Sequence, residues 1–503
     1  MTGLRDDEVV DLLVVGGGIN GAGIARDAAG RGLGVVLAEQ DDLAQHTSSS
    51  STKLIHGGLR YLEHYEFRLV REALIEREVL LNAAPHIIRP LRFVLPHSPD
   101  QRPAWLIRLG LFLYDHLGGR KKLPASSVVD LRTDPAAGPL RPEIRRAYAY
   151  ADCWVDDARL VVLNAKDAAE HGAEILIRTR CTGAERVGDL WEATLASNRG
   201  APVRKIKARA LINAAGPWVS SFLSDRLGFT AANKVRLIKG SHIVVKRLFD
   251  HQSSYIFQNP DGRVVFAIPF EQNYTLIGTT DQEHRGDAAD LTIEDAEIDY
   301  LLTSVNRYFF KPVSREAIVW HYAGVRPLYD DASTSASAVT RDYVFDLDVP
   351  GAGAPLLSVF GGKITTYRKL AEHALERLQP HLRFKAGPWT SKKPLPGGDI
   401  PGADIDAFLE STKSRWPWLP PDLAHRYIGT YGTRIERLLG KAQMLDDLGE
   451  HLGDSLYQAE VDYLIREEWA CTEEDILWRR SKLGLHVSDK TKIQLQRAAA
   501  RST

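Results

Sequence analysis

The spacing of apolar residues near the start of the chain predicts a strand, a turn and a helix in immediate succession. Residues 11–15 form a short leucine- and valine-rich run, which is typical of a parallel strand buried on both faces. The glycine-rich residues 16–21 follow at once, and the alanine-rich stretch 22–30 then predicts a helix. A second apolar run, residues 35–38, predicts another strand. Strand, turn, helix and strand in this order are the parts of a βαβ unit.

Residues 66–84 predict a long charged helix. Ionic side chains recur along it at helical spacing: Arg71, Glu72, Glu76, Arg77 and Glu78. Side chains three or four positions apart on a helix are neighbours and can form ion pairs. We therefore expect these residues to form a solvated, charge-paired face.

The remaining pattern predicts two kinds of sheet and a helical end. Residues 175–177 and 210–212 predict further strands of the nucleotide-binding fold. Residues 242–245 and 264–268 lie in alternating patterns that suit an antiparallel sheet roofing a ligand. The Pro- and Gly-rich residues 385–402 predict a linker, after which the chain is helical and charged.

Length and charge limit the classes of protein that fit this pattern. A chain of 503 residues is too long for one ordinary core, so two or three domains are expected. The 64 Lys and Arg residues nearly balance the 65 Asp and Glu residues, so no overall field selects nucleic acid and any anion site is local. No apolar run is long enough to span a bilayer, and residues 1–11 lack a signal-peptide core. We expect a protein that stays on the cytoplasmic side.

The three cysteines suggest neither a metal site nor a disulfide framework. Cys153, Cys181 and Cys471 are far apart and have no CxxC spacing. We expect buried or half-buried thiols in a reducing compartment, and no metal ion.

The glycines of residues 16–21 have the spacing of a dinucleotide-binding turn. Gly16 permits the tight turn, Gly18 lets the backbone approach a pyrophosphate, and Gly21 lets the helix pack closely on the strand. The N–H groups and dipole at the start of the helix attract phosphate. Glu39, at the end of the second predicted strand, can accept hydrogen bonds from a ribose diol. GxGxxG alone is a weak signal, but here each flanking element is in place.

A run of small hydroxyl residues, 47–53, indicates a cofactor longer than an AMP half. It offers many hydrogen bonds, and residues 56–60 add a Gly-Gly pair flanked by His56 and Arg60. Composition alone also allows a flexible polar loop. The Gly-Gly pair favours close approach of the backbone to something anionic or flat, and so a flavin over a simple nicotinamide cofactor.

Residues 47–63 resemble the FAD-dependent glycerol-3-phosphate dehydrogenases, which are membrane-associated respiratory enzymes with a D-amino-acid-oxidase-like core. Later segments agree and occur in the expected order: 210–218, 239–242, 277–281, 323–328, 357–368 and 476–482. The resemblance covers nearly the whole chain. Taken together these motifs are specific, although several of them are shared by other flavin oxidoreductases.

The resemblance implies an α/β fold with an FAD-binding, Rossmann-like (D-amino-acid-oxidase-like) core, an antiparallel-sheet substrate domain and a C-terminal helical domain. On this basis we assign the FAD-binding domain to residues 1–95, 150–235 and 331–385, the substrate-binding cap to 96–149 and 236–330, and the helical domain to 395–503.

FAD is the expected cofactor, held without a covalent bond because no linkage motif is evident. The residues expected to contact it are Gly16, Gly18, Ile19, Asn20, Gly21, Glu39, Gln40, Thr47, Ser48, Ser49, Ser51, Lys53, Leu54, His56, Gly57, Cys181, Ala215, Gly216, Trp218, Gly361, Gly362, Lys363, Ile364 and Thr365.

The expected substrate is sn-glycerol 3-phosphate, oxidised to dihydroxyacetone phosphate by hydride transfer to FAD. A phosphate dianion requires Arg or Lys in a partly desolvated pocket. The resemblance places four cations at the substrate end of the flavin: Arg60, Arg326, Arg341 and Lys363. Without the resemblance, a surface cation would be the favoured interpretation of each of them. Arg326, between Gly324-Val325 and Pro327, is the strongest on local grounds.

His242 is the first choice for the base that removes the hydroxyl proton, because it follows Gly240-Ser241 in what we expect to be a turn entering a strand. A structural histidine satisfied by the backbone is an equal alternative. Arg326 and Arg60 are assigned to catalysis with it, since an arginine can stabilise a developing alkoxide. Tyr61, Thr280 and Asp281 are further substrate contacts.

The electron acceptor implied by the resemblance is a membrane quinone, since no second GxGxxG unit offers a nicotinamide site. Residues 105–114 are apolar and precede the basic residues 119–122, which suits peripheral contact with lipid at the inner face of the cell membrane. A core helix followed by a solvated loop explains these residues equally well. A homodimer is compatible with the sequence.

Three other functions remain open. An oxygen-reducing glycerol-3-phosphate oxidase would keep the substrate and change the acceptor. An amine or amino-acid oxidase would need one carboxylate-binding arginine, so several converging cations argue against it. A non-catalytic flavin-binding scaffold would hold FAD that no substrate bleaches.

Overall fold

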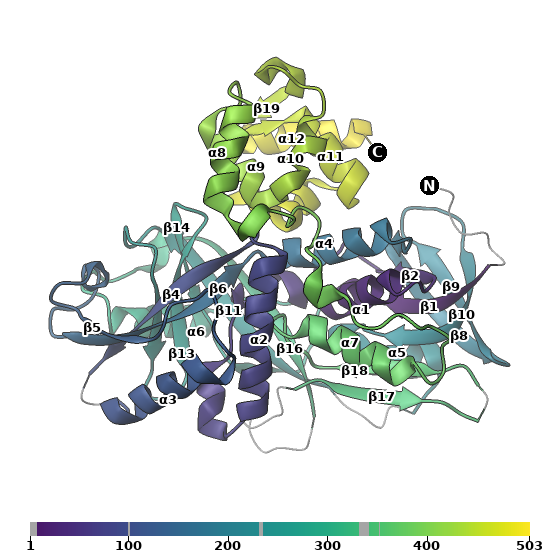
Figure 1. The fold of residues 1–503 in the computed structure, drawn as a ribbon, viewed down its shortest axis with the longest axis horizontal. Helices are drawn as coiled ribbons and strands as arrows, with labels where there is room; N and C mark the ends of the chain where they lie inside the picture. The colour runs from purple at the N-terminus through teal and green to yellow at the C-terminus, as the bar shows by residue number, and fades with distance from the viewer. Residues whose placement is uncertain (1–7, 99–100, 231–234, 331–341, 352, 503) are drawn as a thin grey trace.

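The computed structural model describes residues 8–98, 101–230, 235–330, 342–351 and 353–502. Two large sheets lie side by side, and a helical C-terminal domain stands above them (Figure 1). Among the described residues, no helix combines the length and apolar character needed to cross a membrane.

The first sheet is a mainly parallel one, built around the strand that precedes the glycine-rich turn. Its order is β17-β18-β10-β1-β2-β7, and the hairpin β8-β9 extends from β10. The bounds are Val9–Val15 (β1), Val35–Ala38 (β2), Glu174–Leu176 (β7), Thr179–Val187 (β8), Leu190–Ser197 (β9), Arg204–Asn213 (β10), Val344–Asp348 (β17) and Leu356–Phe360 (β18). The strand predicted at 35–38 is confirmed. β1 and β10 are longer than the predicted strands 11–15 and 210–212, and β7 is shifted by one residue from the predicted 175–177.

Both faces of this sheet are covered, as the unbroken apolar runs require. Alternate side chains such as Leu12 and Val14 pack against α1 (Ile19–Gly30), α4 (Asp157–Glu170) and α7 (Tyr367–Leu378). The opposite set, Leu13 and Val15, packs toward β8, β9 and α5 (Val219–Leu227). Successive side chains of a strand point to opposite faces of the sheet. The helices that pack on Leu12 and Val14, including α1 with the turn before it, therefore lie on the same face.

The second sheet is mainly antiparallel and has the order β15-β11-β14-β13-β12-β4-β6-β3, with β16 on β11 and β5 on β6. The bounds are Leu54–Ile55 (β3), Ile88–His97 (β4), Ser127–Asp130 (β5), Arg146–Val155 (β6), Val235–Lys246 (β11), Ser254–Gln258 (β12), Val264–Phe270 (β13), Tyr274–Gly278 (β14), Gln282–His284 (β15) and Ile318–Tyr329 (β16). β3 and most of β4 and β6 come from ranges assigned to the FAD-binding domain. Helix α6 (Asp295–Asn306) packs against one face.

Helix α2 (Phe67–Ala83) forms where expected, but the prediction of a solvated charged face is wrong for its second half. Glu76, Arg77 and Glu78 are 2%, 4% and 5% exposed. Each has a partner from another segment: Arg368 Nε donates to Glu76 (2.7 Å), Arg77 Nη1 to Asp152 (2.7 Å), and the backbone N of Lys122 to Glu78 (3.2 Å). Helical spacing shows which side chains share a face, but not that other elements cover it.

The C-terminal domain is helical, as predicted, and has its own core. Its helices are α8 (Ile405–Arg415), α9 (Pro421–Tyr431), α10 (Ile435–Leu439), α11 (Gln458–Glu468) and α12 (Asp489–Ser502), with a π-helix at Asp475–Arg480 and a hairpin of β19 (His451–Gly453) and β20 (Leu456–Tyr457). The domain stands on α4 (Figure 1), where Arg159 and Glu468 form a buried ion pair. The predicted linker, 385–402, holds only two 3₁₀ turns, yet Thr390 and Leu395 in it are buried.

Candidate functional site

The turn between β1 and α1 can be made only with glycine at two positions. Gly16 has φ +112°, and a Cβ there would lie 2.4 Å from the carbonyl oxygen of Ala214. A Cβ on Gly21 would lie 1.9 Å from the carbonyl oxygen of Gly16. Gly18 differs, because its φ of −79° suits any residue and the nearest atom to an added Cβ is Ser48 Oγ at 3.2 Å. The absent side chain at Gly18 leaves room over the start of α1, where a phosphate would lie.

The hydroxyl-rich segment lies directly across this turn. Ile19 N donates to Ser48 Oγ (3.0 Å), and Ser48 belongs to a 3₁₀ helix, Thr47–Ser49. Thr47 Oγ1 donates to the carbonyl of Val325 in β16 (2.9 Å) and so fixes the segment to the second sheet. Ser48, one of the hydroxyl residues expected to contact the cofactor, therefore lies beside the glycine turn.

Glu39 holds the turn from the other side. Its carboxylate accepts hydrogen bonds from the backbone N of Gly17 (2.6 Å) and of Asp41 (2.8 Å). Burial raises the pKa of this carboxyl, while the two N–H donors oppose the shift. Glu39 thus organises the backbone beside the helix N-terminus, where a ribose diol would compete for its oxygens.

A cavity of about 760 Å³ opens between these elements. Ten of the residues expected to contact the cofactor line it: Gly16, Gly18, Glu39, Gln40, Thr47, Ser48, Cys181, Ala215, Gly216 and Trp218. Other residues that were not expected from the sequence also line it, among them Asp41, Gln45, His46, Arg180 and Arg226. Arg180 and Arg226 come from β8 and α5 and carry no local motif, so only the fold reveals them.

A second group of expected contacts meets at the far side of the α1 N-terminus. Asn20 Nδ2 donates to the carbonyl of Gly361 (3.0 Å), and a Cβ on Gly362 would lie 2.9 Å from Asn20 Nδ2. The backbone N of His56 donates to Thr365 Oγ1 (3.2 Å). Three segments far apart in sequence, 16–21, 47–57 and 361–365, are therefore in contact with one another.

Several other expected contacts have side chains engaged within the protein. Lys53 is fully buried, and its Nζ donates to Asp157 Oδ1 (2.7 Å); Ser51 Oγ donates to Asp157 Oδ2 (2.7 Å). Burial lowers the pKa of Lys53, and Asp157 opposes that shift. Leu54 is part of a hydrophobic core, and the backbone N of Gly57 donates to Tyr114 Oη (2.8 Å). Asp157, at the start of α4, organises this segment and has no recognisable sequence signal.

The cations predicted to hold the substrate are placed by different elements. Arg326, in β16, lies 3.1 Å from Asp281 Oδ1, and its Nη2 also donates to the carbonyl of Thr280 (3.3 Å). Lys363 Nζ lies 4.1 Å from the centroid of the Tyr61 ring. Arg60 is half-buried on the 3₁₀ helix Leu59–His64, beside Tyr61. Arg341 lies outside the described residues.

Thr280 is buried in a network of its own. Its hydroxyl accepts from the backbone N of Ser241 (2.8 Å) and donates to Glu297 Oε1 (2.7 Å). Ser241 Oγ also donates to Glu297 (2.8 Å). These contacts join β11, the turn after β14, and α6 at the point where Arg326 and Asp281 meet.

His242 lies within β11 and not in the turn that the sequence suggested, because Gly240 and Ser241 continue the strand opposite β16. Its Nε2 lies 3.0 Å from Thr52 Oγ1, and among the described residues its buried Nδ1 has no hydrogen-bond partner. Burial, and then the nearby Lys53 and Arg326, lower the pKa of His242 to about 3. The imidazole is therefore neutral at physiological pH, the form that a proton acceptor requires.

This arrangement fits a flavin dinucleotide. The glycine turn and the α1 N-terminus suit the pyrophosphate, and the cavity beside Glu39 suits the AMP half. Two buried polar atoms, Asn20 Oδ1 at the start of α1 and His242 Nδ1 in β11, have no hydrogen-bond partner among the described residues. Buried polar atoms are rarely left unpaired, so they indicate a bound group.

Comparison with known families agrees with this geometry. Residues 11–368 match the family described as FAD dependent oxidoreductase. The chain belongs to the FAD-dependent oxidoreductases. Residues 389–501 match a second family, the C-terminal domain of alpha-glycerophosphate oxidase. The predictions of FAD as cofactor, of a redox enzyme and of a C-terminal helical domain are thereby confirmed.

This FAD-dependent oxidoreductase has relatives of similar length. It is 57% identical over 488 residues to the glycerol-3-phosphate dehydrogenase of Pseudomonas aeruginosa, covering 97% of this chain and 94% of that protein. It is 55% identical over 486 residues to the D-erythritol 1-phosphate dehydrogenase of Brucella abortus, covering 97% of each. Among solved structures, the glycerol-3-phosphate dehydrogenase of Bacillus halodurans complexed with FAD is 25% identical, with a TM-score of 0.77 over 99% of this chain and 95% of that one. The resemblance predicted from the motifs is confirmed.

Proposed function

We propose that this oxidoreductase converts sn-glycerol 3-phosphate to dihydroxyacetone phosphate and passes the electrons to a membrane quinone. The observation that carries the proposal is sequence identity above 50%, over almost the full length, to enzymes named as dehydrogenases of phosphorylated polyols. Three of the cations that the resemblance assigned to the substrate, Arg60, Arg326 and Lys363, lie in described parts of the structure and support it.

In this proposal Arg326, Lys363 and Arg60 hold the phosphate. Arg326 is paired with Asp281, so an arriving dianion competes for a guanidinium that is already oriented by the backbone of Thr280. Lys363, over the Tyr61 ring, supplies a second positive charge. Two cations fixed by different segments select a doubly charged ester over the single charge of an amino-acid carboxylate.

His242 accepts the proton of the substrate hydroxyl at Nδ1, the ring nitrogen without a hydrogen-bond partner among the described residues. Thr52 fixes the other nitrogen. Bound FAD supplies the hydride acceptor. The protein's part is to orient the carbinol, exclude water and stabilise the developing alkoxide, for which Arg326 is the candidate.

D-Erythritol 1-phosphate is a second candidate substrate, because the Brucella relative named for it is as similar to this chain as the Pseudomonas enzyme is. Both compounds are phosphate monoesters of polyols with a secondary alcohol. The same cations would bind either one, so the rest of the pocket must discriminate between them.

Anaerobic mixing decides between the substrates. The purified holoenzyme is mixed separately with glycerol 3-phosphate, D-erythritol 1-phosphate and unphosphorylated glycerol, and the flavin absorbance is followed. We expect fast bleaching by glycerol 3-phosphate and none by glycerol. Faster bleaching by D-erythritol 1-phosphate would change the substrate assignment, and no bleaching by either ester would refute the proposal. Reoxidation by a soluble quinone and by oxygen then distinguishes a dehydrogenase from an oxidase.

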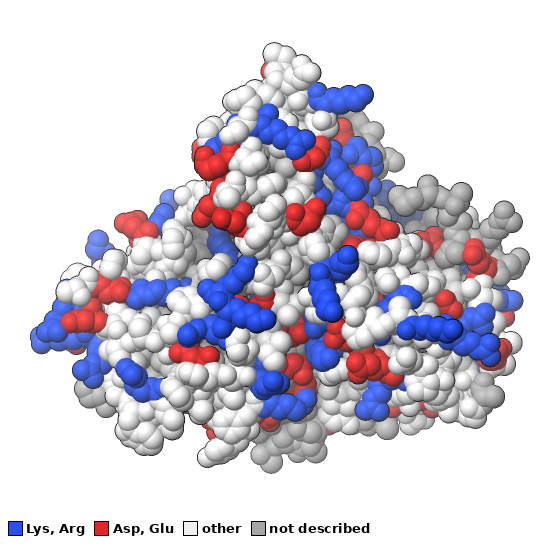
Figure 2. All heavy atoms as spheres, in the orientation of Figure 1, with Lys and Arg blue, Asp and Glu red and all other residues white. Residues whose placement is uncertain are grey.

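We further propose that the enzyme lies in the cytoplasm, bound peripherally to the inner face of the cell membrane through α3 (Ala104–Leu117). One face of α3 packs inward through Ile107, Leu111 and Tyr114. Its other face exposes Trp105 (66%), Leu109 (48%) and Phe112 (58%). The surface over α3 is mostly uncharged, at the lower left of Figure 2. Apolar rings followed by Arg120, Lys121 and Lys122 suit the boundary of an anionic lipid layer.

A further inference from the structure

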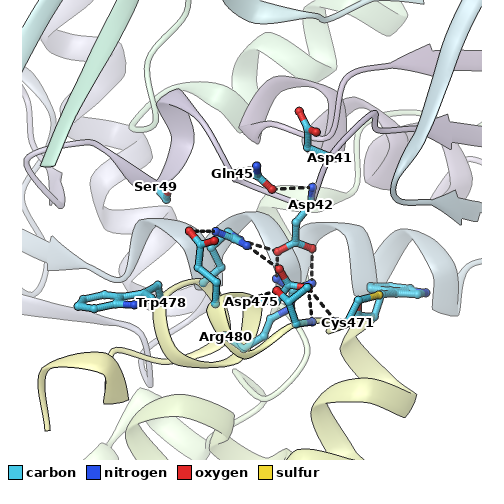
Figure 3. Close-up of polar contacts among 12 residues, drawn as sticks. Asp41, Asp42, Gln45, Ser49, Cys471, Asp475, Trp478 and Arg480 are labelled. Atoms are coloured by element: carbon cyan, nitrogen blue, oxygen red, sulfur yellow. Dashed lines mark hydrogen bonds and ion pairs between the residues drawn. The ribbon is translucent and has the colours of Figure 1, made fainter. Parts of the chain in front are cut away.

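A cluster of buried charges joins the C-terminal domain to the loop that follows Glu39 (Figure 3). At its centre, the Asp42 carboxylate is fully buried and accepts from Arg480 through both oxygens, from Nη1 at 2.6 Å and from Nη2 at 2.7 Å. Arg479 Nε donates to the same carboxylate (2.6 Å). One loop carboxylate is thus held by two arginines of the C-terminal domain.

The two arginines are themselves held in place. Arg480 Nε donates to the carbonyl of Glu468 (2.9 Å). Arg479 donates to Asp475, which also accepts from Arg178 (2.9 Å to each oxygen) and from the backbone N of Cys471 (2.8 Å). Burial raises the pKa of Asp475, but Arg479 and Arg480 outweigh it and hold that pKa well below its usual value. The carboxylate is therefore ionised at any physiological pH.

Two adjacent arginines of the π-helix Asp475–Arg480 reach one carboxylate. Neighbouring residues of an α-helix point in different directions. In this π-helix both Arg479 and Arg480 contact Asp42. Single π-turns are uncommon and occur often at functional sites.

Asp42 lies in the middle of the loop that builds the cavity, while its own side chain points the other way. Residues 39–41 before it and 44–48 after it line the cavity, and Asp42 does not. Its backbone N donates to Gln45 Oε1 (3.1 Å), and the carbonyl of Asp41 accepts from Arg178 N (2.7 Å). The loop is thus fixed at its centre from outside the cavity.

We propose that Arg479 and Arg480 are positioning residues, through which the C-terminal domain holds residues 39–48 in the shape that accepts FAD. When a loop becomes ordered only as its ligand binds, the entropy cost of ordering the loop lowers the affinity for that ligand. A loop that is already held in its bound shape avoids this cost. A buried carboxylate that loses its partners becomes strongly unfavourable, so without the arginines the loop would move to expose Asp42 to water. The affinity for FAD therefore depends on a domain that lines no part of this cavity.

The test compares two carboxylate-to-amide substitutions that are alike in burial and partner. Asp42→Asn weakens the cluster, and Glu468→Gln weakens the other fully buried carboxylate–arginine pair between the same domains, with Arg159. The apoprotein of each variant is titrated with FAD by fluorescence. We expect the FAD Kd of Asp42→Asn to rise by about 5- to 150-fold, as for a typical coupling between sites. We expect Glu468→Gln to bind FAD like the wild type, because it changes only the side chain and keeps the backbone carbonyl that holds Arg480.

A second readout separates positioning from simple adhesion between domains. Bound FAD raises the Tm by an amount set by its concentration relative to Kd. If the cluster positions the loop, Asp42→Asn lowers the FAD-induced rise, and Arg480→Lys, which keeps the charge but loses the two-pronged contact, gives an intermediate value. If Asp42→Asn lowers the Tm of the apoprotein but binds FAD as Glu468→Gln does, the proposal is overturned. If Asp42→Asn does not fold, the FAD Kd of Arg480→Lys against Glu468→Gln decides in the same way.

Discussion

The imidazole of His242 lies 4.7 Å from the ring of Tyr322, and the two planes are within 14° of parallel. Tyr322 is fixed in turn, because its hydroxyl donates to the carbonyl of Ser51 (2.8 Å). Behind the imidazole, Gly278 leaves no room for a side chain, since a Cβ there would lie 2.0 Å from His242 Cδ2. The ring therefore has one orientation, set by its neighbours before any substrate arrives.

His242→Gln is expected to slow substrate oxidation without releasing FAD. A positioned general base contributes about 10²- to 10⁴-fold, so flavin reduction in single-turnover experiments should slow by that factor. The control is Tyr322→Phe, which keeps the stacked ring and loses only the hydrogen bond to Ser51; its effect should be smaller. Reduction at the wild-type rate in His242→Gln would mean that this histidine is structural.

Gly18→Ala is expected to weaken FAD binding in a protein that still folds. The backbone at Gly18 suits alanine, and the added methyl would lie 3.2 Å from Ser48 Oγ, over the helix N-terminus. We expect the FAD Kd to rise at least about tenfold, equivalent to about 1.4 kcal/mol. The matched control is Gly429→Ala in α9, where an added Cβ meets nothing within 4 Å. Gly21→Ala should instead lower the Tm sharply, because its Cβ would lie 1.9 Å from a backbone oxygen.

The glycine turn could be predicted from the sequence because each of its constraints lies in neighbouring residues. Gly16, Gly18 and Gly21 act on the backbone of the strand and helix that they connect, and the alternation of the strands places that turn on one face of the sheet. The same holds for β2, whose bounds agree with the predicted strand at 35–38. Local order in the sequence is enough where the physical contact is local.

The partners of buried charges could not be predicted in this way. Asp42 and Arg480 are 438 positions apart, and Lys53 and Asp157 are 104 apart. Each looks like an ordinary polar residue in its own segment. Only the packing of segments that are far apart in the sequence shows that it is buried and paired. For the same reason Arg180 was missed as a cavity residue, and Glu76 was expected to face solvent.

Arg326→Ala is expected to raise the KM for the phosphorylated substrate while leaving the FAD content unchanged. A hydrogen bond to a charged group contributes about 1.5–3 kcal/mol, so KM should rise roughly tenfold to a hundredfold. Asp281→Asn is the control, since it removes the carboxylate beside Arg326 and keeps the guanidinium; its KM should stay closer to the wild type. Loss of FAD from Arg326→Ala would show that this arginine serves the cofactor.

Acid should destabilise the protein through its buried histidines. Burial, followed by Arg159 and Arg434, lowers the pKa of His86 to about 3, and the pKa of His242 is also about 3. Between pH 3 and 6.5 these two histidines bind more protons in the unfolded chain than in the folded one, so their contribution to the free energy of unfolding falls as the pH falls. Each histidine contributes at most about 1.4 kcal/mol per pH unit below 6.5.

His86→Leu tests this, because it removes one of the two groups. Its free energy of unfolding, from denaturant titrations at several pH values, should depend less on pH between 4 and 6.5 than that of the wild type. His381→Leu, at an exposed histidine, should keep the wild-type slope. If the free energy of unfolding depends equally on pH in all three proteins, the pKa of His86 is not lowered in the folded state.

Replacing the exposed apolar residues of α3 is expected to release the enzyme from membranes without changing its chemistry. Trp105, Leu109 and Phe112 project from the face that does not pack inward, so changing all three to Ser should leave the fold and the FAD content intact. We expect co-sedimentation with vesicles containing anionic lipid to fall, since binding of this kind scales with the apolar area inserted. Anaerobic bleaching by the soluble substrate should be unchanged, whereas turnover with a vesicle-bound quinone should fall.

A control with Val203 and Phe310 changed to Ser, two apolar residues exposed elsewhere, should sediment like the wild type. Equal sedimentation of the α3 variant and this control would exclude α3 as the surface that meets lipid.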